Sequence, residues 1–570
     1  MSYLSNEILI SLLKQYKIFK LVLSSGARNI PFVSTVETDN AFECYSVIDE
    51  RNAAFFALGL QQQSGEPVAI ACTSGTAASN YLSGVTEAFY SNAPLVIITF
   101  DRGPYMLNQL ETQKIDQTVI FSGVCKKSVS LPIIKDDDDV WYCRRLINEA
   151  LIALGQHGSG PVHINVPLIG NQNDLVDASV AFKKFGTANK IEYIAENNGA
   201  VWDRMAEKLN ASKRILVVMG QMSNIDSSEK SAMDNFFNAY QCPILADNLS
   251  NYRCEQMVFS EAVIKALNSK TAAPLVPDIV ISFGCNFQER IKDIMRVHRG
   301  NFEHWSIEPS GNVKDVFKSQ TALFECPTEV FFQKMTELHK DNNGGSEEYL
   351  KKWKRLEKAI SLPEMPFNNF YTVQEFAKVI PKNSLLHLSI LNCTRLMQFF
   401  KLDASVKVYS NVNAFGIDGC LPTFMGQAYG TDCPAFLVTG DLSFFYGMNA
   451  AAIKHRKNNI RILLINNGGG AEFHIMPDSN LIPTIDLHIG AAHDRKAQGW
   501  AESIGYEYLR ADNKESLASA LKSFVSNNHD APVLLEVFTD MKKDGEYTLS
   551  VYRHIEKCIE SELNRMGENE

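Results

Sequence analysis

Two apolar segments, each followed directly by polar turn residues, constrain the fold of this chain most strongly. Residues 435–439 run into Gly440 and Asp441, and residues 460–465 run into an Asn-Asn pair that ends at Asn467, 26 positions after Asp441. Short apolar runs bounded by such turns are typical of buried strands. Residues 448–455 between them have a helical composition, so the stretch predicts a strand–helix–strand unit with parallel strands.

The turn residues of this unit predict a ligand site. In open parallel sheets, ligands bind just beyond the carboxyl ends of the strands. Asp441 offers a carboxylate, Asn467 an amide oxygen and Gly469 a backbone carbonyl. These are the hard oxygen ligands that Mg²⁺ or Ca²⁺ takes when the ion also holds phosphate oxygens. The alternative is an ordinary strand–helix–strand unit in which turn residues merely stand where turns fall.

The same alternation of apolar strands and helical stretches recurs along the 570 residues. It predicts three α/β domains, each with a doubly wound parallel sheet. We expect a first domain over 1–180, a central domain over 190–345, a third domain over 365–545 and a helical tail over 546–570. A polar linker is expected over 181–205, and a second linker with one exposed helix over 341–370.

Composition and charge exclude several functions. The net charge is −10 and no basic stripe occurs, so nucleic-acid binding is not expected. No apolar run is long enough for a membrane span, and the N-terminus has the pattern of an amphipathic helix and not that of a signal peptide. Twelve cysteines without a paired spacing indicate reduced thiols in a cytoplasmic protein and no zinc site. The acidic run 136–139 is expected to be a solvated loop.

Two sets of polar residues in the first domain can have either a structural or a catalytic role. Glu50 opens a predicted helix whose next turns are rich in Ala, Phe and Leu. It either complements the helix dipole together with Asp49, or it is a carboxylate in apolar surroundings that shares a proton with a ligand nitrogen. Both interpretations stay open from the sequence. His163 and Asn165 lie in an apolar strand and are expected to be packed strand residues.

Several motifs in the same order give the chain a family resemblance. They are SSGARNIPF, IDERNAAFFALGL, CTSGTAASN, FDRGPYMLN, ETQKIDQ, ILADNLSNYR, NAFGIDG and GDLSFFYGMNAAA. With these motifs the chain resembles the thiamine-diphosphate-dependent 2-oxo-acid decarboxylase and synthase superfamily over nearly its whole length. Within it, the chain is most similar to the 2-succinyl-5-enolpyruvyl-6-hydroxy-3-cyclohexene-1-carboxylate synthase family of menaquinone biosynthesis.

The resemblance implies a cofactor site that uses residues from two domains. Glu50 would bond the pyrimidine ring of thiamine diphosphate, and Ile417 would lie under the cofactor and hold it bent. Asp441, Asn467 and the Gly469 carbonyl would bind Mg²⁺, which bridges the diphosphate. The cofactor-binding residues implied in all are Glu50, Thr73, Ile417, Gly440, Asp441, Leu442, Ser443, Asn467, Gly469 and Gly470.

The resemblance also implies the partners of the reaction. A 2-oxo acid would lose CO₂, and the remaining carbanion would add to an acceptor. In this family the 2-oxo acid is 2-oxoglutarate and the acceptor is isochorismate. In the superfamily, the glutamate and the diphosphate site come from two chains, so a homodimer or a dimer of dimers is implied. The substrate-binding residues implied are Arg28, Arg102, Gln113, Arg290, Asn392, Arg395 and Phe473.

The chain departs from the family pattern near the substrates. The family's arginine before the Gly-Ile-Asp-Gly segment is Val412 here, its serine before Arg395 is Leu391, and the serine beside Arg28 is Ala27. An apolar position after the Asn-Asn pair is Glu472, for which we expect an acid/base role or a hydrogen bond to a hydroxylated substrate. The alternative for Glu472 is a loop residue that points to solvent.

These departures leave three hypotheses for the function. The first is the menaquinone-pathway carboligase with its standard substrates. The second is a paralogous lyase or carboligase that acts on another 2-oxo acid or on another acceptor such as an activated sugar. The third is a catalytically silent protein of the same fold, which the presence of Glu50, Asp441 and Asn467 disfavours.

Overall fold

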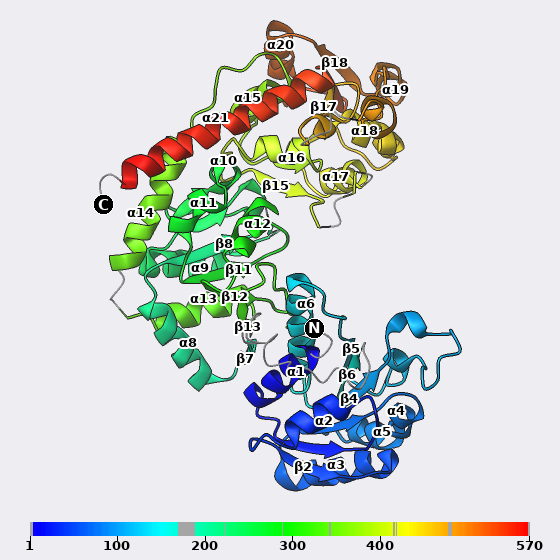
Figure 1. Ribbon diagram of the computed structural model, residues 1–570. Coiled ribbons are helices and arrows are strands. Elements are labelled where there is room, and N and C mark those ends of the chain that lie inside the picture. The colour runs from blue at the N-terminus through cyan, green and yellow to red at the C-terminus, as the bar shows by residue number, and fades with distance from the viewer. Residues whose placement is uncertain are drawn as a thin grey trace. The chain divides into compact units, whose positions relative to one another are not determined.

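The computed structural model describes residues 4–168, 189–222, 224–287, 289–340, 344–413, 416–417, 419–476 and 482–567 (Figure 1). Contacts between residues divide the chain into two compact units, Met1–Ala195 with Pro309–Glu325, and Glu196–Glu308 with Cys326–Glu570. In both units, strands alternate with helices and the described strand pairs are parallel. The predicted α/β class with parallel sheets is therefore confirmed, while the predicted domain boundaries stay predictions.

The first unit is built on a six-stranded sheet with the order β2-β1-β3-β4-β6-β5. Because β2 and β3 lie on opposite sides of β1, the strand order reverses there, which is where open sheets place their ligands. Its strands are β1 (Lys20–Leu23), β2 (Glu43–Ser46), β3 (Val68–Cys72), β4 (Leu95–Asp101), β5 (Lys127–Ser130) and β6 (Val162–Pro167). Its α-helices are α1 (Leu4–Gln15), α2 (Ile30–Val36), α3 (Glu50–Ser64), α4 (Thr76–Asn80), α5 (Leu82–Tyr90) and α6 (Asp137–Ala153).

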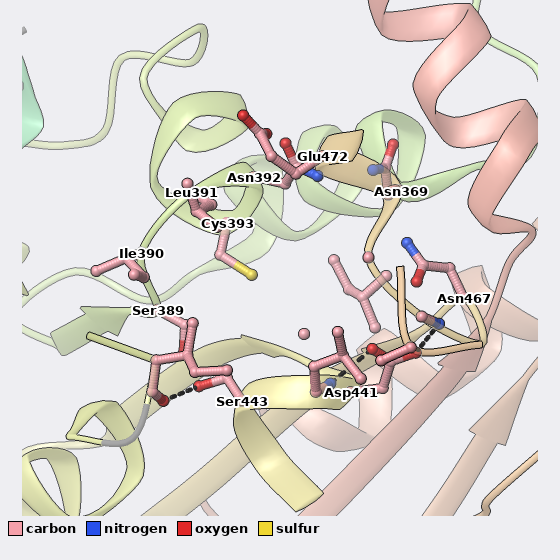
Figure 2. A pocket seen from close by; sticks show the side chains of 18 of the residues that line it. Asn369, Ser389, Ile390, Leu391, Asn392, Cys393, Asp441, Ser443, Asn467 and Glu472 are labelled. Atoms are coloured by element: carbon pink, nitrogen blue, oxygen red, sulfur yellow. Dashed lines mark hydrogen bonds between the residues drawn. The ribbon is translucent and has the colours of Figure 1, made fainter. Parts of the chain in front are cut away.

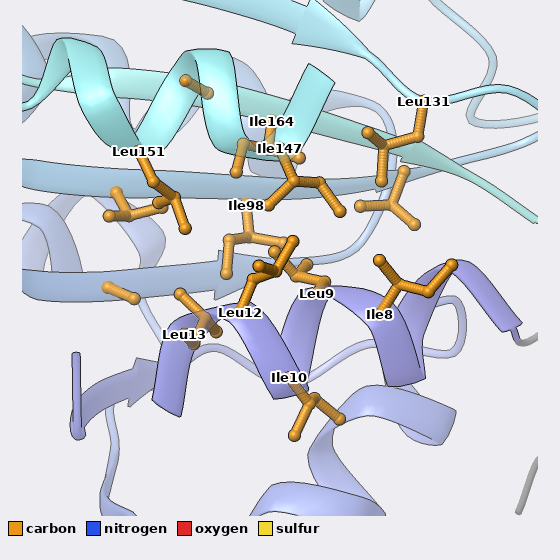
Figure 3. Close-up of a cluster of buried hydrophobic side chains, with 14 of the residues drawn as sticks. Ile8, Leu9, Ile10, Leu12, Leu13, Ile98, Leu131, Ile147, Leu151 and Ile164 are labelled. Carbon is orange, nitrogen blue, oxygen red and sulfur yellow. The ribbon is translucent and has the colours of Figure 1, made fainter. Parts of the chain in front are cut away.

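The N-terminal helix α1 is part of the core of this unit, as its amphipathic pattern predicts. Its apolar residues recur at helical spacing, and Leu9, Leu12 and Leu13 are fully buried. They pack in one cluster with Ile98 of β4 and Ile147 of α6, as Figure 3 shows. Burial of large apolar side chains of this kind stabilises a fold by about 1.5–3 kcal/mol each.

The first half of the second unit holds five neighbouring parallel strands with the order β10-β9-β8-β11-β12. These strands are β8 (Ile215–Met219), β9 (Ile244–Ala246), β10 (Met257–Phe259), β11 (Ile279–Phe283) and β12 (Glu303–Ile307). The α-helices of this part are α8 (Gly199–Ala211), α9 (Ser227–Tyr240), α10 (Ser260–Ala266), α11 (Ser269–Ala272), α12 (Glu289–Val297), α13 (Thr328–Glu337) and α14 (Gly344–Ala359).

The last sheet of the chain positions the predicted ligand site. Its order is β15-β14-β16-β17-β19-β18, so the strand order reverses between β14 and β16. The strands are β14 (Leu385–Leu388), β15 (Lys407–Ser410), β16 (Ala435–Gly440), β17 (Ile460–Asn466), β18 (Glu507–Ala511) and β19 (Val533–Phe538). The α-helices are α15 (Asn369–Val379), α16 (Asn392–Met397), α17 (Cys420–Tyr429), α18 (Asp441–Gly447), α19 (Gln498–Ser503), α20 (Lys514–Phe524) and α21 (Met541–Gly567).

Three local predictions are wrong for identifiable reasons. The acidic run 136–139 starts α6, because the Asp136 carboxylate accepts hydrogen bonds from the backbone N–H groups of Asp138 and Asp139. The predicted linker 181–205 contains β7 (Glu192–Ala195), which pairs with β13 (Gln320–Glu325) in the first unit, and the start of α8. Its residues 181–188 lie outside the described ranges. The helix expected at 448–455 begins instead at Asp441 as α18 and continues as a 3-10 turn over Met448–Ala452.

The prediction that His163 and Asn165 are packed strand residues is confirmed. His163 and Asn165 are buried in β6 and form hydrogen bonds with Thr99. None of the helices in the described ranges combines the length and the continuous apolar surface that a bilayer crossing requires.

Candidate active site

A cavity of about 600 Å³ opens where the strand order of the last sheet reverses. The segments that follow β14, β16 and β17 form most of its wall, so the carboxyl ends of three neighbouring parallel strands meet there. Figure 2 shows Asp441, Ser443 and Asn467 on one side of this cavity, and Leu391, Asn392 and Glu472 on the opposite side. We call it the main cavity.

Asp441 joins the two turns that the sequence singles out. Its carboxylate accepts hydrogen bonds from the backbone N–H groups of Leu442 (2.6 Å), Gly468 (2.8 Å) and Gly469 (3.0 Å). His493 Nε2 lies 3.5 Å from the same carboxylate. Burial raises the pKa of Asp441, while His493 and the three N–H groups act in the opposite direction. The turn after β16 is thereby fixed to the turn after β17, and one buried carboxylate lies at their junction.

Asn467 is oriented by a second buried carboxylate, that of Asp544. The Asn467 Nδ2 donates to Asp544 Oδ2 over 3.0 Å, so the amide oxygen is left for other ligands. Asp544 also accepts from the Thr539 hydroxyl at 2.7 Å and from the backbone N–H of Asn369 at 3.0 Å. Burial raises the pKa of Asp544 to about 6. Three donors from three segments therefore hold one carboxylate that fixes the side chain of Asn467.

The oxygen atoms at this end of the cavity suit a hard cation. Asp441, Asn467 and Gly469 all line the main cavity, as a shared metal site requires. The described residues contain no cluster of three His, Cys, Asp or Glu side chains, so a cation here would need amide or carbonyl oxygens and ligands from a bound molecule. That combination of a carboxylate, an amide and phosphate oxygens is the usual set for Mg²⁺ bound together with a phosphorylated ligand.

The remaining predicted cofactor residues of the second unit lie around the same cavity. Gly440, Leu442 and Gly470 line it together with Ile417 and Ser443. The Ser443 hydroxyl donates to the backbone carbonyl of Ile417 over 2.7 Å, which ties the segment of Ile417 to the start of α18. Leu442 takes the place of the second glycine in the family pattern, and its side chain contributes apolar wall there. The structure thus brings these five residues together around one cavity.

The opposite side of the main cavity carries the predicted substrate residues Asn392 and Phe473 together with Glu472. Glu472 is not a loop residue directed to solvent, because its side chain is only 12% exposed and forms an ion pair with Arg395. Leu391 beside them adopts φ 63°, a conformation uncommon for a residue with a side chain. The backbone at this corner is therefore held in an unusual shape by its surroundings.

A second cavity of about 140 Å³ lies beside this corner, and we call it the side cavity. Arg395, Arg290 and Val412 line it, and so do Lys265 and Glu261 of α10. Arg290 donates through Nε and Nη2 to the backbone carbonyl of Leu267, which fixes its guanidinium. Burial lowers the pKa of Lys265, whose Nζ lies 4.4 Å from the centre of the Tyr552 ring.

The predicted residues of the first unit gather at the carboxyl ends of β1, β3 and β4. The backbone N–H of Arg28 donates to the Thr73 hydroxyl over 3.2 Å. Arg102 follows β4, and its Nη1 lies 2.6 Å from a Glu111 oxygen. Gln113 is exposed and adopts φ 57°. The structure therefore places Arg28 beside Thr73, and Arg102 forms an ion pair with Glu111 in the segment after β4.

A buried polar network supports that loop. Lys114 Nζ lies 2.6 Å from an Asp101 oxygen in an ion pair whose side chains are almost fully buried, and Lys114 also donates to the carbonyl of Arg102. Gln117 accepts from the backbone N–H of Gly75 over 2.8 Å. A buried ion pair of this kind fixes geometry more than it adds stability.

Glu50 is the first residue of α3, with Asp49 as its N-cap. Its Oε2 accepts from the Asn80 amide over 3.4 Å, and its side chain is partly buried. Large apolar residues are exposed on the elements near Glu50: Ile48, Phe55, Phe56 and Leu82. Glu50 therefore has both the helix-start position and the apolar surroundings that its two interpretations require.

Comparison with known proteins decides the family. The chain is 35% identical over 558 residues to the 2-succinyl-5-enolpyruvyl-6-hydroxy-3-cyclohexene-1-carboxylate synthase of Bacteroides thetaiotaomicron, which covers 96% of this chain and 98% of that protein. The chain belongs to this synthase family. Proteins of the same name from Bacteroides fragilis and Phocaeicola vulgatus are 35% and 34% identical over 552 and 547 residues, covering 96% and 94% of this chain and 98% and 95% of theirs.

Residues 5–120 of this member of the synthase family match the protein-family model described as thiamine pyrophosphate enzyme, N-terminal TPP binding domain. The protein is accordingly a thiamine-diphosphate-dependent enzyme of the transferase and lyase type. The predicted family, reaction type and organic cofactor are confirmed.

Sequence reasoning missed one residue that supports the wall of the main cavity and several that line it. The supporting residue is Asp544, which holds the Asn467 amide and follows β19, a strand of the same parallel sheet. The rule that directed attention to Asp441 and Asn467, that ligand groups follow the carboxyl ends of parallel strands, applied equally to Asp544. Other missed residues that line the cavity are Asn369, Ser389, Cys393 and Arg495. No spacing in the sequence marks these four.

Proposed function

We propose that the protein is a thiamine-diphosphate- and Mg²⁺-dependent carboligase that decarboxylates a 2-oxo acid and joins the remaining acyl group to an acceptor. One observation carries the proposal: Asp441, Asn467 and Gly469 share one cavity at the reversal point of a parallel sheet, in a chain that matches a member of the synthase family over 96% of its length. In the reaction the bond between C1 and C2 of the donor breaks, CO₂ leaves, and C2 forms a new bond to the acceptor, which takes up a proton.

We assign the metal and the diphosphate to the side of the main cavity at Asp441. Asp441, the Asn467 amide oxygen and the Gly469 carbonyl would hold Mg²⁺, while Asp544 keeps the Asn467 oxygen turned toward the ion. Gly440, Leu442, Ser443 and Gly470 would form the rest of the cradle. Thiamine diphosphate supplies the carbon nucleophile and the electron sink that decarboxylation of a 2-oxo acid needs.

We assign Glu50 to the proton on the pyrimidine ring nitrogen, with Thr73 nearby in the first unit. A carboxylate at the start of a helix and among apolar residues can share a proton with such a nitrogen. As the resemblance implies, Glu50 would come from a second copy of the chain. The exposed apolar residues around it, Phe55 and Phe56 among them, fit burial in a homodimer or a dimer of dimers. Sedimentation of wild type and of Phe55→Asp tests this: the variant should be monomeric and inactive.

For the substrates, the resemblance implies 2-oxoglutarate as donor and isochorismate as acceptor. Arg28, Arg102 and Arg290 would then bind carboxylates, since guanidinium groups suit them best, and the Gln113 amide would donate a hydrogen bond. A second candidate is the same reaction on another donor or acceptor. The ion pair between Glu472 and Arg395 favours that candidate, because it occupies an arginine that the family pattern assigns to substrate.

The test is release of CO₂ from a panel of 2-oxo acids by the purified full-length protein with thiamine diphosphate and Mg²⁺. The proposal expects CO₂ from at least one acid, and a new carbon–carbon bond when an acceptor is present. Asp441→Ala should abolish release. If wild type with bound cofactor releases no CO₂ from any 2-oxo acid, the carboligase proposal fails and a silent protein of this fold remains.

A further inference from the structure

The boundary between the main cavity and the side cavity carries an arrangement of charge that the reaction itself does not explain. Leu391 lines both cavities, Glu472 lines the main cavity and Arg395 lines the side cavity. The ion pair between Glu472 and Arg395 therefore spans the boundary. Figure 2 shows Glu472 beside Leu391 and Asn392, across the cavity from Asp441.

The ion pair leaves an acceptor without a partner at this boundary. Glu472 binds Arg395 through Oε1, and its Oε2 is buried with no hydrogen-bond partner among the described residues. A buried acceptor of this kind costs free energy until a donor reaches it. The charge of Arg395 is meanwhile matched by Glu472, so it is not available to a ligand anion without breaking the pair.

The neighbours of Glu472 define which ligand group would fit. Leu391 and Phe473 supply apolar wall, and Asn392 supplies an amide that can donate and accept. A hydroxyl group could accept from Asn392 and donate to Glu472. A carboxylate at the same place would face the Glu472 carboxylate, and like charges in contact are strongly unfavourable.

We propose that this corner of the main cavity selects a 2-oxo acid whose far end carries an uncharged hydrogen-bonding group such as a hydroxyl, and that it rejects a second carboxylate there. The inference rests on the proposed function, because it assumes that a 2-oxo acid reacts at the Asp441 side of the same cavity. Val412 agrees with it, since an apolar residue lines the side cavity where the family pattern has an arginine.

Three matched acids test the selection on the wild-type enzyme: 5-hydroxy-2-oxopentanoate, 2-oxopentanoate and 2-oxoglutarate. They share the first four carbons and differ only at C5, which is a CH₂OH group, a CH₃ group or a carboxylate. The kcat/KM for CO₂ release should be highest for the hydroxyl acid and at least about tenfold lower for 2-oxoglutarate, as a like-charge contact implies. If 2-oxoglutarate is the best of the three, the inference is overturned.

The variant Glu472→Gln tests whether Glu472 causes the rejection of a second carboxylate. It keeps the shape of the side chain, removes its charge and frees Arg395, so kcat/KM for 2-oxoglutarate should rise about tenfold or more. Glu562→Gln is the matched control, because Glu562 also pairs with an arginine, Arg355, and its side chain is 15% exposed, but it lines neither cavity. The control should keep the wild-type preference. A Glu472→Gln enzyme that is folded and has lost activity on 2-oxoglutarate would contradict the inference.

A binding measurement separates failure of this inference from failure of the proposed function. If no acid releases CO₂, the proposed function fails. Calorimetric titration of the protein, loaded with Mg²⁺ and a thiamine diphosphate analogue whose central ring is neutral and unreactive, then still ranks the three acids. Tighter binding of the hydroxyl acid than of 2-oxoglutarate, reversed in Glu472→Gln, supports the selection. The opposite order in wild type overturns it.

Discussion

Asp544→Asn should weaken Mg²⁺ binding although Asp544 is not itself among the proposed ligands. Its carboxylate accepts three hydrogen bonds, from the Asn467 amide, the Thr539 hydroxyl and the Asn369 backbone N–H. An asparagine has one acceptor oxygen, so its NH₂ group must face at least one of these three donors. At least one hydrogen bond is lost, and the bond from the Asn467 amide is either lost or made to a neutral oxygen in place of a charged one, so its own oxygen is held less firmly toward the cavity.

The magnitude follows from that lost contact. A hydrogen bond to a charged group contributes about 1.5–3 kcal/mol. At about 1.4 kcal/mol for each factor of ten, this corresponds to a loss of roughly 10–100-fold in affinity, which is also the usual effect of changing a residue that orients a metal ligand. The half-saturating Mg²⁺ concentration for CO₂ release, measured at saturating thiamine diphosphate, should rise by that factor, with kcat largely restored at high Mg²⁺.

Asp540→Asn is the control for this prediction. Asp540 lies one turn earlier, is exposed, and accepts from the backbone N–H of Lys543 instead of from Asn467. Its substitution should leave the Mg²⁺ requirement unchanged. A half-saturating Mg²⁺ concentration for Asp544→Asn within twofold of wild type would refute the reasoning, and so would an equal shift in both variants.

Three further predictions concern other parts of the chain. Glu50→Gln should lower kcat by about 10²–10⁴-fold, the usual contribution of a general acid–base group, while thiamine diphosphate still binds; a kcat within tenfold of wild type would exclude the proposed role. Burial raises the pKa of Asp247 to about 6 from an ordinary value near 4, so the folded protein binds this proton more tightly than the unfolded chain, and stability falls as pH rises from 4 to 6. Asp247→Asn removes this loss, so its free energy of unfolding relative to wild type should increase by at most about 3 kcal/mol between pH 4 and pH 7 and then stay level; a difference that does not change with pH would contradict the assignment. Gly84→Ala should lower the free energy of unfolding by about 1–3 kcal/mol, because the added Cβ would lie 2.5 Å from the Ala54 Cβ where α5 packs on α3; an unchanged denaturation midpoint would show that the helices can separate freely.

The fold could be predicted because the signals that encode it are local. Buried parallel strands are short apolar runs, and the runs at 435–439 and 460–465 appear in the structure as β16 and β17 with similar bounds. Edge strands such as β18 mix polar and apolar residues, with Glu507 and Arg510 exposed, and they carry no such run. Helix starts that depend on a side-chain cap, as at Asp136, were likewise missed.

The candidate site could be predicted only in part, for a related reason. Asp441 and Asn467 stand next to apolar strands, so their position at the sheet edge follows from local sequence. The ion pair between Arg395 and Glu472 joins residues 77 positions apart, and the bond from Asn467 to Asp544 also spans 77 positions. Pairs of that separation are created by the strand order, which one sequence does not reveal. The ion-pair partner of Glu472 is therefore seen only in the structure.

The most direct test of the account is a calorimetric titration of the full-length protein with thiamine diphosphate, carried out with and without Mg²⁺. The account predicts one bound cofactor per chain when Mg²⁺ is present, and binding weakened about 100-fold or more in Asp441→Asn, because that variant loses a charged metal ligand and part of the link between the two turns. Binding of equal strength in wild type and Asp441→Asn, or binding that needs no divalent cation, would contradict the assignment of this cavity to the metal and the diphosphate.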